Sequence, residues 1–68
     1  MIQVLVESAG GAVEIFSFAT RIDAVLFMER ATAEADRDAR RITLCESGLP
    51  IYTRKRTDAG WKDEPGGG

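Results

Sequence analysis

The sequence predicts an α+β domain in the order ββαββ, with one helix packed across one face of a four-stranded antiparallel sheet. Three observations support this fold. Two pairs of short segments alternate apolar and polar residues, each pair contains a turn with glycine, and the residues between the pairs carry apolar side chains at helical spacing. Because a single helix cannot cover both faces of such a sheet, the second face is expected to be open.

The first pair of strands spans Ile2–Glu7 and Ala12–Phe18, joined by a turn at Gly10-Gly11, where glycine readily supplies a positive φ. Alternation in the first strand places Ile2, Val4 and Val6 on the face toward the core. In the second strand we expect Val13 and Ile15 to face inward. The side chains expected on the open face are Glu14, Phe16 and Phe18.

A helix is predicted from Arg21 to Ala35, because Thr20 is a favourable N-cap and Asp23 stands at the acidic position of a capping box. Spacing of 3.6 residues places one apolar face against the sheet; its members are Ala24, Phe27, Met28, Ala31 and Ala35, with Val25 at the edge. Ile22 and Leu26 fall nearly opposite, so the first half of the helix is apolar on a second side.

The second pair of strands spans Arg41–Glu46 and Ile51–Arg56, with a turn at residues 47–50. Alternation predicts an inward set of Ile42, Leu44, Ile51 and Thr53, and an outward set of Thr43, Cys45, Tyr52, Arg54 and Arg56. We expect Trp61 to fold back over the sheet. The domain would then comprise residues 1–61, and residues 62–68 would form a flexible polar tail that ends in glycines.

These faces define an expected core and an expected open surface. The core should contain Val4, Val6, Ile15, Ala24, Met28, Ala31, Ile42 and Leu44. The open face should carry Leu5, Phe16, Phe18, Cys45, Tyr52 and Trp61, rimmed by Arg41, Arg54 and Arg56. Exposed apolar area of this kind is typical of an interaction site.

The composition argues against catalysis and against bound cofactors. The 68 residues include no histidine and one cysteine, Cys45, so the chain can form neither an internal disulfide nor a tetrahedral zinc site. A nucleophile would need an activating base, and none is evident near Cys45 in the sequence. We therefore expect no enzyme activity, no catalytic residues, no metal and no cofactor.

The N-terminal residues, the lack of a long apolar run and the single cysteine point to a cytoplasmic protein. Residues 2–7 lack the basic and long apolar regions of a secretory signal, no run of residues is long and apolar enough to cross a membrane, and a lone cysteine suits a reducing compartment. The net charge is −2, which does not favour nucleic acid, although the charged residues within 37–57 are mostly basic. Tyr52, Arg54 and Arg56 on an open sheet would nevertheless suit single-stranded nucleic acid, which remains an alternative.

The hairpin of residues 2–18, the helix after Thr20 and the terminal Gly67-Gly68 resemble the ubiquitin-like β-grasp carriers and modifiers. This resemblance covers the first two-thirds of the chain as a pattern, and it implies a carrier activated at its terminal glycine. A β-grasp also needs a late strand beside the first strand, for which residues 61–65 are short and polar.

The whole pattern also resembles the small ββαββ inhibitor proteins of phages and mobile elements, including some anti-CRISPR proteins. The resemblance lies in the Thr20-capped helix and in the hairpin from Ile42-Thr43-Leu44 to Pro50-Ile51-Tyr52-Thr53, closed by Gly60-Trp61. It implies a protein that occupies a surface on a larger complex, and it assigns no binding residue.

The favoured interpretation is a non-enzymatic binding module, an inhibitor or accessory subunit that docks on a larger protein or ribonucleoprotein complex. Aromatic and arginine side chains dominate most interfaces, so the expected partner-binding residues are Phe16, Tyr52, Arg54, Arg56 and Trp61. Ile22 and Leu26 would form a homodimer contact, because association stabilises a chain with a thin core. Direct binding of nucleic acid and a β-grasp carrier remain the alternatives.

Overall fold

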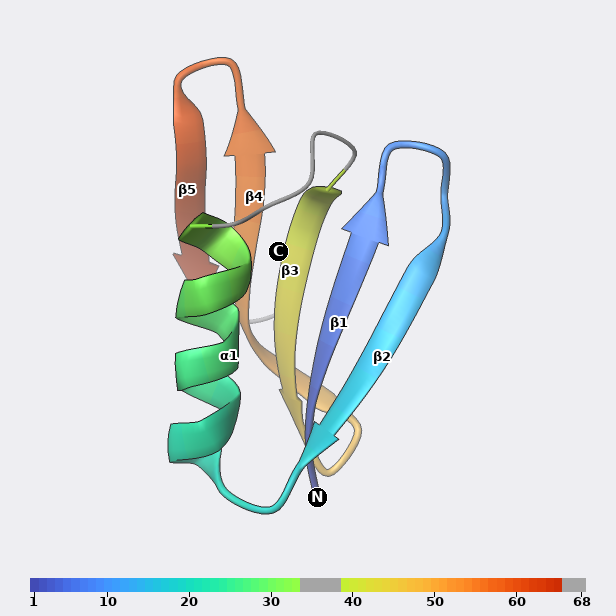
Figure 1. The fold of residues 1–68 in the computed structure, drawn as a ribbon, viewed down its shortest axis with the longest axis vertical. Helices are drawn as coiled ribbons and strands as arrows, with labels where there is room; N and C mark the ends of the chain where they lie inside the picture. Colours follow the sequence, from blue (N-terminus) through green and yellow to red (C-terminus); the bar gives the residue numbers. More distant parts are fainter. Residues whose placement is uncertain (34–38, 66–68) are drawn as a thin grey trace.

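In residues 1–33 and 39–65, which the computed structural model describes, one helix lies across a five-stranded antiparallel sheet (Figure 1). The order of strands in the sheet is β2-β1-β3-β4-β5. The elements along the chain are β1 (Ile2–Ser8), β2 (Val13–Phe18), α1 (Arg21–Ala33), β3 (Ala39–Glu46), β4 (Leu49–Thr57) and β5 (Gly60–Pro65). The α+β class is confirmed, and the order of elements is ββαβββ.

The prediction of four strands is wrong, because residues 60–65 form a further strand. β5 pairs antiparallel with β4 from Thr57↔Gly60 to Tyr52↔Pro65. The turn between them is closed by the Thr57 hydroxyl, which donates to the carbonyl of Gly60 at 2.7 Å, and Gly60 has a φ of 113°. Edge strands commonly carry charged side chains and proline, as β5 does. The alternation of apolar and polar residues by which the other strands were predicted is therefore missing from β5. Residues 66–68 of the expected tail lie outside the described residues.

The strand order places β1 between β2 and β3, both antiparallel to it. The helix connects β2 to β3 across the sheet, and β5 lies beyond β3 and β4 (Figure 1). In a β-grasp the last strand runs beside the first, so the observed topology differs from that of the ubiquitin-like proteins. The terminal glycines of that alternative fall among residues that the structure does not describe.

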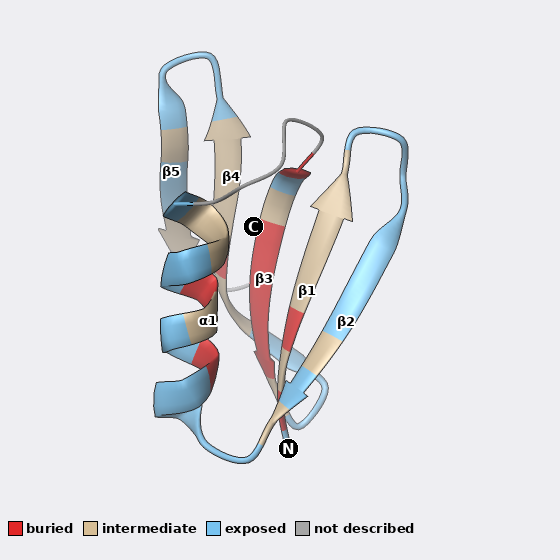
Figure 2. Cartoon of the chain, in the orientation of Figure 1, coloured by how far each residue is buried: buried red, intermediate tan, exposed pale blue. Residues whose placement is uncertain are grey.

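The core lies between α1 and the centre of the sheet, where Figure 2 shows the buried residues on β1, β3 and the inner side of the helix. Its buried members are Ile2, Val4, Ala24, Met28, Ile42 and Leu44. Five of the predicted core residues are therefore confirmed: Val4, Ala24, Met28, Ile42 and Leu44. Val6 and Ala31 are half-buried and pack against this cluster.

The predicted orientation of β2 is wrong. Phe16 pairs with Val4 and Phe18 with Ile2, so the two phenylalanines share the face that α1 covers. Their rings lie 4.6 and 5.2 Å from the ring of Phe27 on the helix, measured between centroids. Ile15, expected in the core, is 60% exposed on the opposite face. Burying two aromatic rings removes more apolar area from water than burying the smaller aliphatic side chains.

Ile51 packs against the core as predicted, but the predicted orientation of β4 is wrong from Tyr52 onward, and a β-bulge explains the change. The β3–β4 turn starts in the expected phase, with Glu46 opposite Leu49 and Cys45 opposite Pro50. The register then shifts by one residue, so that Leu44 pairs with Tyr52. An extra residue in one strand turns every later side chain to the other face. As a result Tyr52, Arg54 and Arg56 lie on the helix-covered face, and Thr53 lies on the other.

Candidate protein-binding face

The helix α1 begins at a cap that the sequence predicts. The backbone N–H of Asp23 donates to the Thr20 hydroxyl oxygen at 3.2 Å, and the N–H of Ala24 reaches the Thr20 carbonyl at 3.3 Å. This cap sets the residue at which the helix begins, and Ala24 and Met28 are buried on the side that packs on the sheet. The opposite side of the same turns is therefore presented to solvent.

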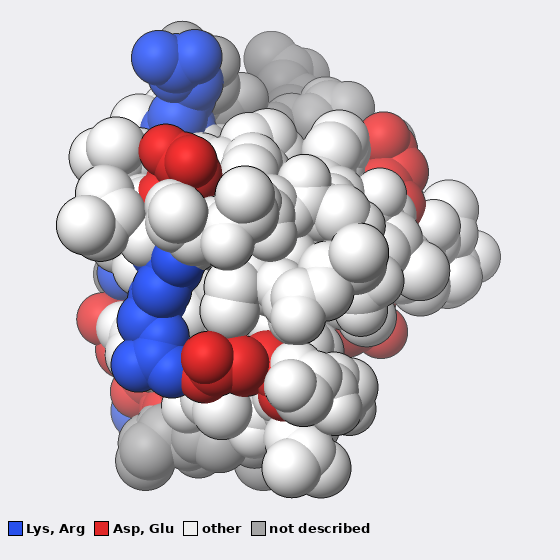
Figure 3. Space-filling view, turned by 90° about the horizontal axis from the view of Figure 1, so that it is seen from below, with Lys and Arg blue, Asp and Glu red and all other residues white. Residues whose placement is uncertain are grey.

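An apolar patch forms that outer side of α1 and consists of Ile22, Val25 and Leu26. Ile22 is 72% and Leu26 62% exposed, which confirms that these two side chains lie away from the sheet. Together with Arg21 they line a shallow hollow of about 270 Å³. Figure 3 views the molecule from the end at which α1 begins, and much of that face is uncharged. We call Ile22, Val25 and Leu26 the helix patch.

A second hollow, of about 240 Å³, continues from the helix patch toward the sheet. Val25 lines both hollows, and the other lining residues are Met28, Glu29, Leu44, Tyr52 and Arg54. Its apolar lining is contributed by core residues from α1 and β3, and its polar lining by Glu29, Tyr52 and Arg54. An apolar side chain placed here would extend the core of the domain.

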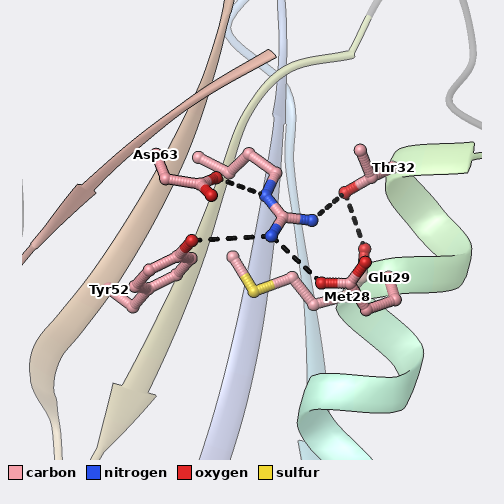
Figure 4. Close-up of polar contacts among 6 residues, drawn as sticks. Met28, Glu29, Thr32, Tyr52 and Asp63 are labelled. Carbon is pink, nitrogen blue, oxygen red and sulfur yellow. Dashed lines mark hydrogen bonds and ion pairs between the residues drawn. The ribbon is translucent and has the colours of Figure 1, made fainter.

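Arg54 is the centre of the polar side of this hollow, and its side chain is only 11% exposed. Its Nε–H donates to Asp63 on β5 at 2.6 Å, and its Nη1 donates to the Thr32 hydroxyl at 2.9 Å (Figure 4). Its Nη2 donates to Glu29 at 3.0 Å and to the Tyr52 hydroxyl at 3.5 Å. The guanidinium therefore joins α1, β4 and β5, and we call these contacts the Arg54 network.

The Arg54 network changes the pKa values of its members. Burial alone lowers the pKa of Arg54, but hydrogen bonds with Tyr52, Asp63 and Glu29 outweigh it and raise the pKa above its ordinary value. The Tyr52 hydroxyl and then the Arg54 guanidinium hold the pKa of Asp63 below its usual range. The interaction with Asp63 also raises the pKa of Tyr52. Arg54 therefore stays charged, and Asp63 stays ionised, at neutral pH.

Acid should weaken the fold through Asp63. Because the pKa of Asp63 is lower in the folded than in the unfolded chain, its contribution is present above the unfolded value of about 4 and is lost as the pH falls through the folded value. We expect Asp63→Asn to unfold at a lower temperature than wild type at pH 7, and the difference to shrink below about pH 4. Thermal unfolding between pH 7 and pH 2 measures this.

The control for this pH series is Glu14→Gln, which neutralises an exposed acid on β2, outside the Arg54 network. It should follow the wild-type curve. A gap between Asp63→Asn and wild type that stays constant across the whole pH range would show that the ionisation of Asp63 does not matter.

The expected binding residues have different positions in the fold. Phe16 packs on Phe27 beneath the helix, and Tyr52 and Arg54 belong to the Arg54 network. The Arg56 guanidinium lies over the Trp61 ring at 5.8 Å, and its Nη1 also reaches the Ala39 carbonyl at 3.5 Å. The structure brings Tyr52 and Arg54 next to the helix patch, while Arg56 pairs with Trp61 toward the far end of β4.

A basic hollow of about 330 Å³ lies near Arg56, at the ends of β1, β3 and β4. Its lining residues are Glu7, Ser8, Arg40, Arg41, Lys55 and Arg56. Arg41 pairs with Glu7 at 3.7 Å, and Lys55 pairs with Glu64 at 3.2 Å. The sequence contains two short basic runs, Arg40-Arg41 and residues 54–56. The β3–β4 register, with Arg41 opposite Lys55, brings these two runs side by side.

The part of the chain that the structure describes offers little for a metal site or for a nucleophile. No three His, Cys, Asp or Glu side chains within it gather as metal ligands would, and none of its helices is long and apolar enough to cross a membrane. Cys45 is buried, and burial raises the pKa of its thiol, which disfavours the nucleophilic thiolate.

Comparisons with protein-family models, with curated proteins and with solved structures found no match for this chain. Its function can therefore be inferred only from the chemistry of its own surface.

Proposed function

We propose that the chain is a non-enzymatic protein-binding module that docks on a larger protein or ribonucleoprotein complex through the helix patch. The observation that carries the proposal is the exposure of Ile22 and Leu26 beside a hollow that opens toward the core. Large aliphatic side chains on a surface helix are usually turned inward. An inhibitor of the kind that phages encode, or an accessory subunit, would act by occupying a surface in this way.

The energetics support the helix patch as the main contact. Fully burying a leucine or isoleucine side chain contributes about 1.5–3 kcal/mol, so covering Ile22 and Leu26 gives a substantial apolar term. Polar groups beside the hollow are already paired in the Arg54 network, so a partner would meet a preorganised rim. Tyr52 and Arg54, expected as partner-binding residues, would contribute as that rim.

Phe16 and Trp61, which were also expected to bind the partner, are less exposed than the helix patch and are less well supported as contacts. Phe16 packs beneath α1, and Trp61 packs against the core cluster and lies under Arg56. The nucleic-acid alternative relied on Tyr52, Arg54 and Arg56 standing together on an open face. The bulge in β4 turns them toward the helix, where Arg54 is engaged with Glu29 and Asp63. A protein partner is therefore the better supported proposal.

Leu26→Asp should weaken partner binding strongly while the fold persists. The substitution places a charge in the centre of the helix patch, and burying that charge in an interface is strongly unfavourable. The immobilised protein would first capture its partner from a lysate of the source cells, and the affinity would then be measured with the purified partner. We expect a loss of at least about 30-fold, which corresponds to about 2 kcal/mol.

The matched control is Ile15→Lys, which charges an equally exposed aliphatic side chain on the opposite face of the sheet. It should bind the partner as wild type does. Equal affinities of Leu26→Asp and wild type would contradict the proposal, and so would capture of nucleic acid in place of any protein.

A further inference from the structure

The edge strand β2 differs from the edge strand β5 in a way that bears on self-association. Natural sheets protect their edges with charged side chains and proline, because exposed backbone groups pair with other strands. β5 carries Lys62, Asp63 and Glu64 and ends at Pro65. β2 has the sequence VEIFSF, with Glu14 as its charged residue, and is rich in strand-forming residues. Only one of the two edges is protected.

Two hydrogen bonds show which backbone groups of β2 face the edge. The N–H of Ser8 donates to the Ala12 carbonyl at 2.9 Å, so this position of the β1–β2 ladder is a hydrogen-bonded pair. The N–H of Ser47 donates to the Met1 carbonyl at 3.1 Å. The backbone N–H and C=O groups of the odd-numbered residues in β1 therefore point toward β3. Both hydrogen bonds mean that the backbone N–H and C=O groups of the even-numbered residues in β1 and in β2 point toward each other. The N–H and C=O groups of Val13, Ile15 and Ser17 therefore point away from β1.

We propose that β2 of one molecule pairs antiparallel with β2 of a second copy, which makes one continuous sheet across a homodimer. A two-fold axis at Ile15 places Ile15 opposite Ile15 of the second copy and Val13 opposite Ser17 of the second copy. These are the residues whose backbone groups point outward, so each pair can exchange ladder hydrogen bonds.

Side chains on both faces suit this arrangement. Glu14 would lie opposite Phe16 of the second copy, so no like charges face each other across the axis. Ile15 is 60% exposed on the face opposite α1, and the axis places it against its own copy there, where cross-strand apolar pairs stabilise sheets. The same operation leaves the two helices on one side of the sheet.

The size of the contact sets its strength. A single pair of six-residue strands is smaller than a standard interface, so we expect a weak dimer, with a dissociation constant on the order of 10–100 µM. The helix patch stays exposed in this dimer, so its formation does not depend on the proposed partner. The expected homodimer contact through Ile22 and Leu26 gives a competing prediction.

Sedimentation velocity from about 1 to 500 µM, a range that brackets the expected constant, tests the proposal. Wild type should pass from monomer to dimer, and Ile15→Lys should raise the dissociation constant at least tenfold. Leu26→Lys, the matched change on the helix patch, should leave it unchanged. Thermal unfolding confirms that both variants fold.

Amide hydrogen exchange gives a second measurement on the wild-type protein. The amides of Val13, Ile15 and Ser17 should exchange more slowly at the high end of the concentration range than at the low end. A protein that stays monomeric throughout would overturn the proposal. So would a dimer that Leu26→Lys dissociates and Ile15→Lys leaves intact, since that result assigns the contact to α1.

Discussion

Leu44→Ala should destabilise the protein enough to leave it close to unfolding at room temperature. Leu44 is 4% exposed, packs in the core cluster between α1 and the sheet, and lines the hollow beside the helix patch. Truncating a buried leucine typically costs about 2–5 kcal/mol. A domain of 68 residues has a total stability of only about 3–10 kcal/mol. Urea unfolding followed by circular dichroism measures the loss.

The matched control is Leu49→Ala, at the start of β4. Leu49 is 68% exposed, so the same truncation should cost less than about 0.5 kcal/mol. A melting temperature for Leu44→Ala within a degree or two of wild type would mean that Leu44 does not face the core. Equal losses in the two variants would contradict the packing on both strands.

The elements themselves could be predicted well, because they depend on local patterns. Alternation from Ile2 to Val6 identified β1 and its inward face, and the cap at Thr20 with 3.6-residue spacing identified α1 and both of its apolar sides. Ile42 and Leu44 were placed inward for the same reason and are buried. In the two strands one face is clearly more apolar than the other, and in α1 the regular spacing assigned each apolar side chain to its side of the helix.

The pairing between elements could not be predicted, because it depends on where one strand meets another. In β2 both faces are apolar, so alternation alone could not decide whether Ile15 or Phe16 faces inward. In β4 the inward orientation of Ile51 was right, and the bulge before Tyr52 reversed the orientation of the residues that follow. β5 was missed since Trp61 is its single large apolar side chain, and one such residue gives no alternating pattern.

Errors of register also explain why one part of the candidate site was predicted correctly and another part was not. The exposure of Ile22 and Leu26 followed from the helix alone and is confirmed. The placement of Arg54 on an open face followed from the wrong phase of β4. Its contacts with Glu29 and Asp63 join elements far apart in the chain, and nothing in the local pattern indicates them.

Arg54→Met should lower the free energy of unfolding by about 2–3 kcal/mol. The methionine retains an apolar stem but removes the guanidinium that binds Asp63, Thr32 and Glu29. Charge-assisted hydrogen bonds of this kind stabilise a fold more than neutral ones do. Glu29 and Asp63 are both more than half exposed, so water can solvate their carboxylates in the variant, which keeps the loss below that of a fully buried charge.

The control for this variant is Arg30→Met, which removes a guanidinium from an exposed position on α1 and should cost less than about 0.5 kcal/mol. Arg54→Lys adds a second comparison, because lysine keeps the charge but cannot donate to three separated acceptors in fixed directions. We expect its stability to lie between those of Arg54→Met and wild type. If Arg54→Met and Arg30→Met are equally stable, Arg54 does not fasten α1 to β4 and β5, and the rim beside the helix patch must be held by apolar packing alone.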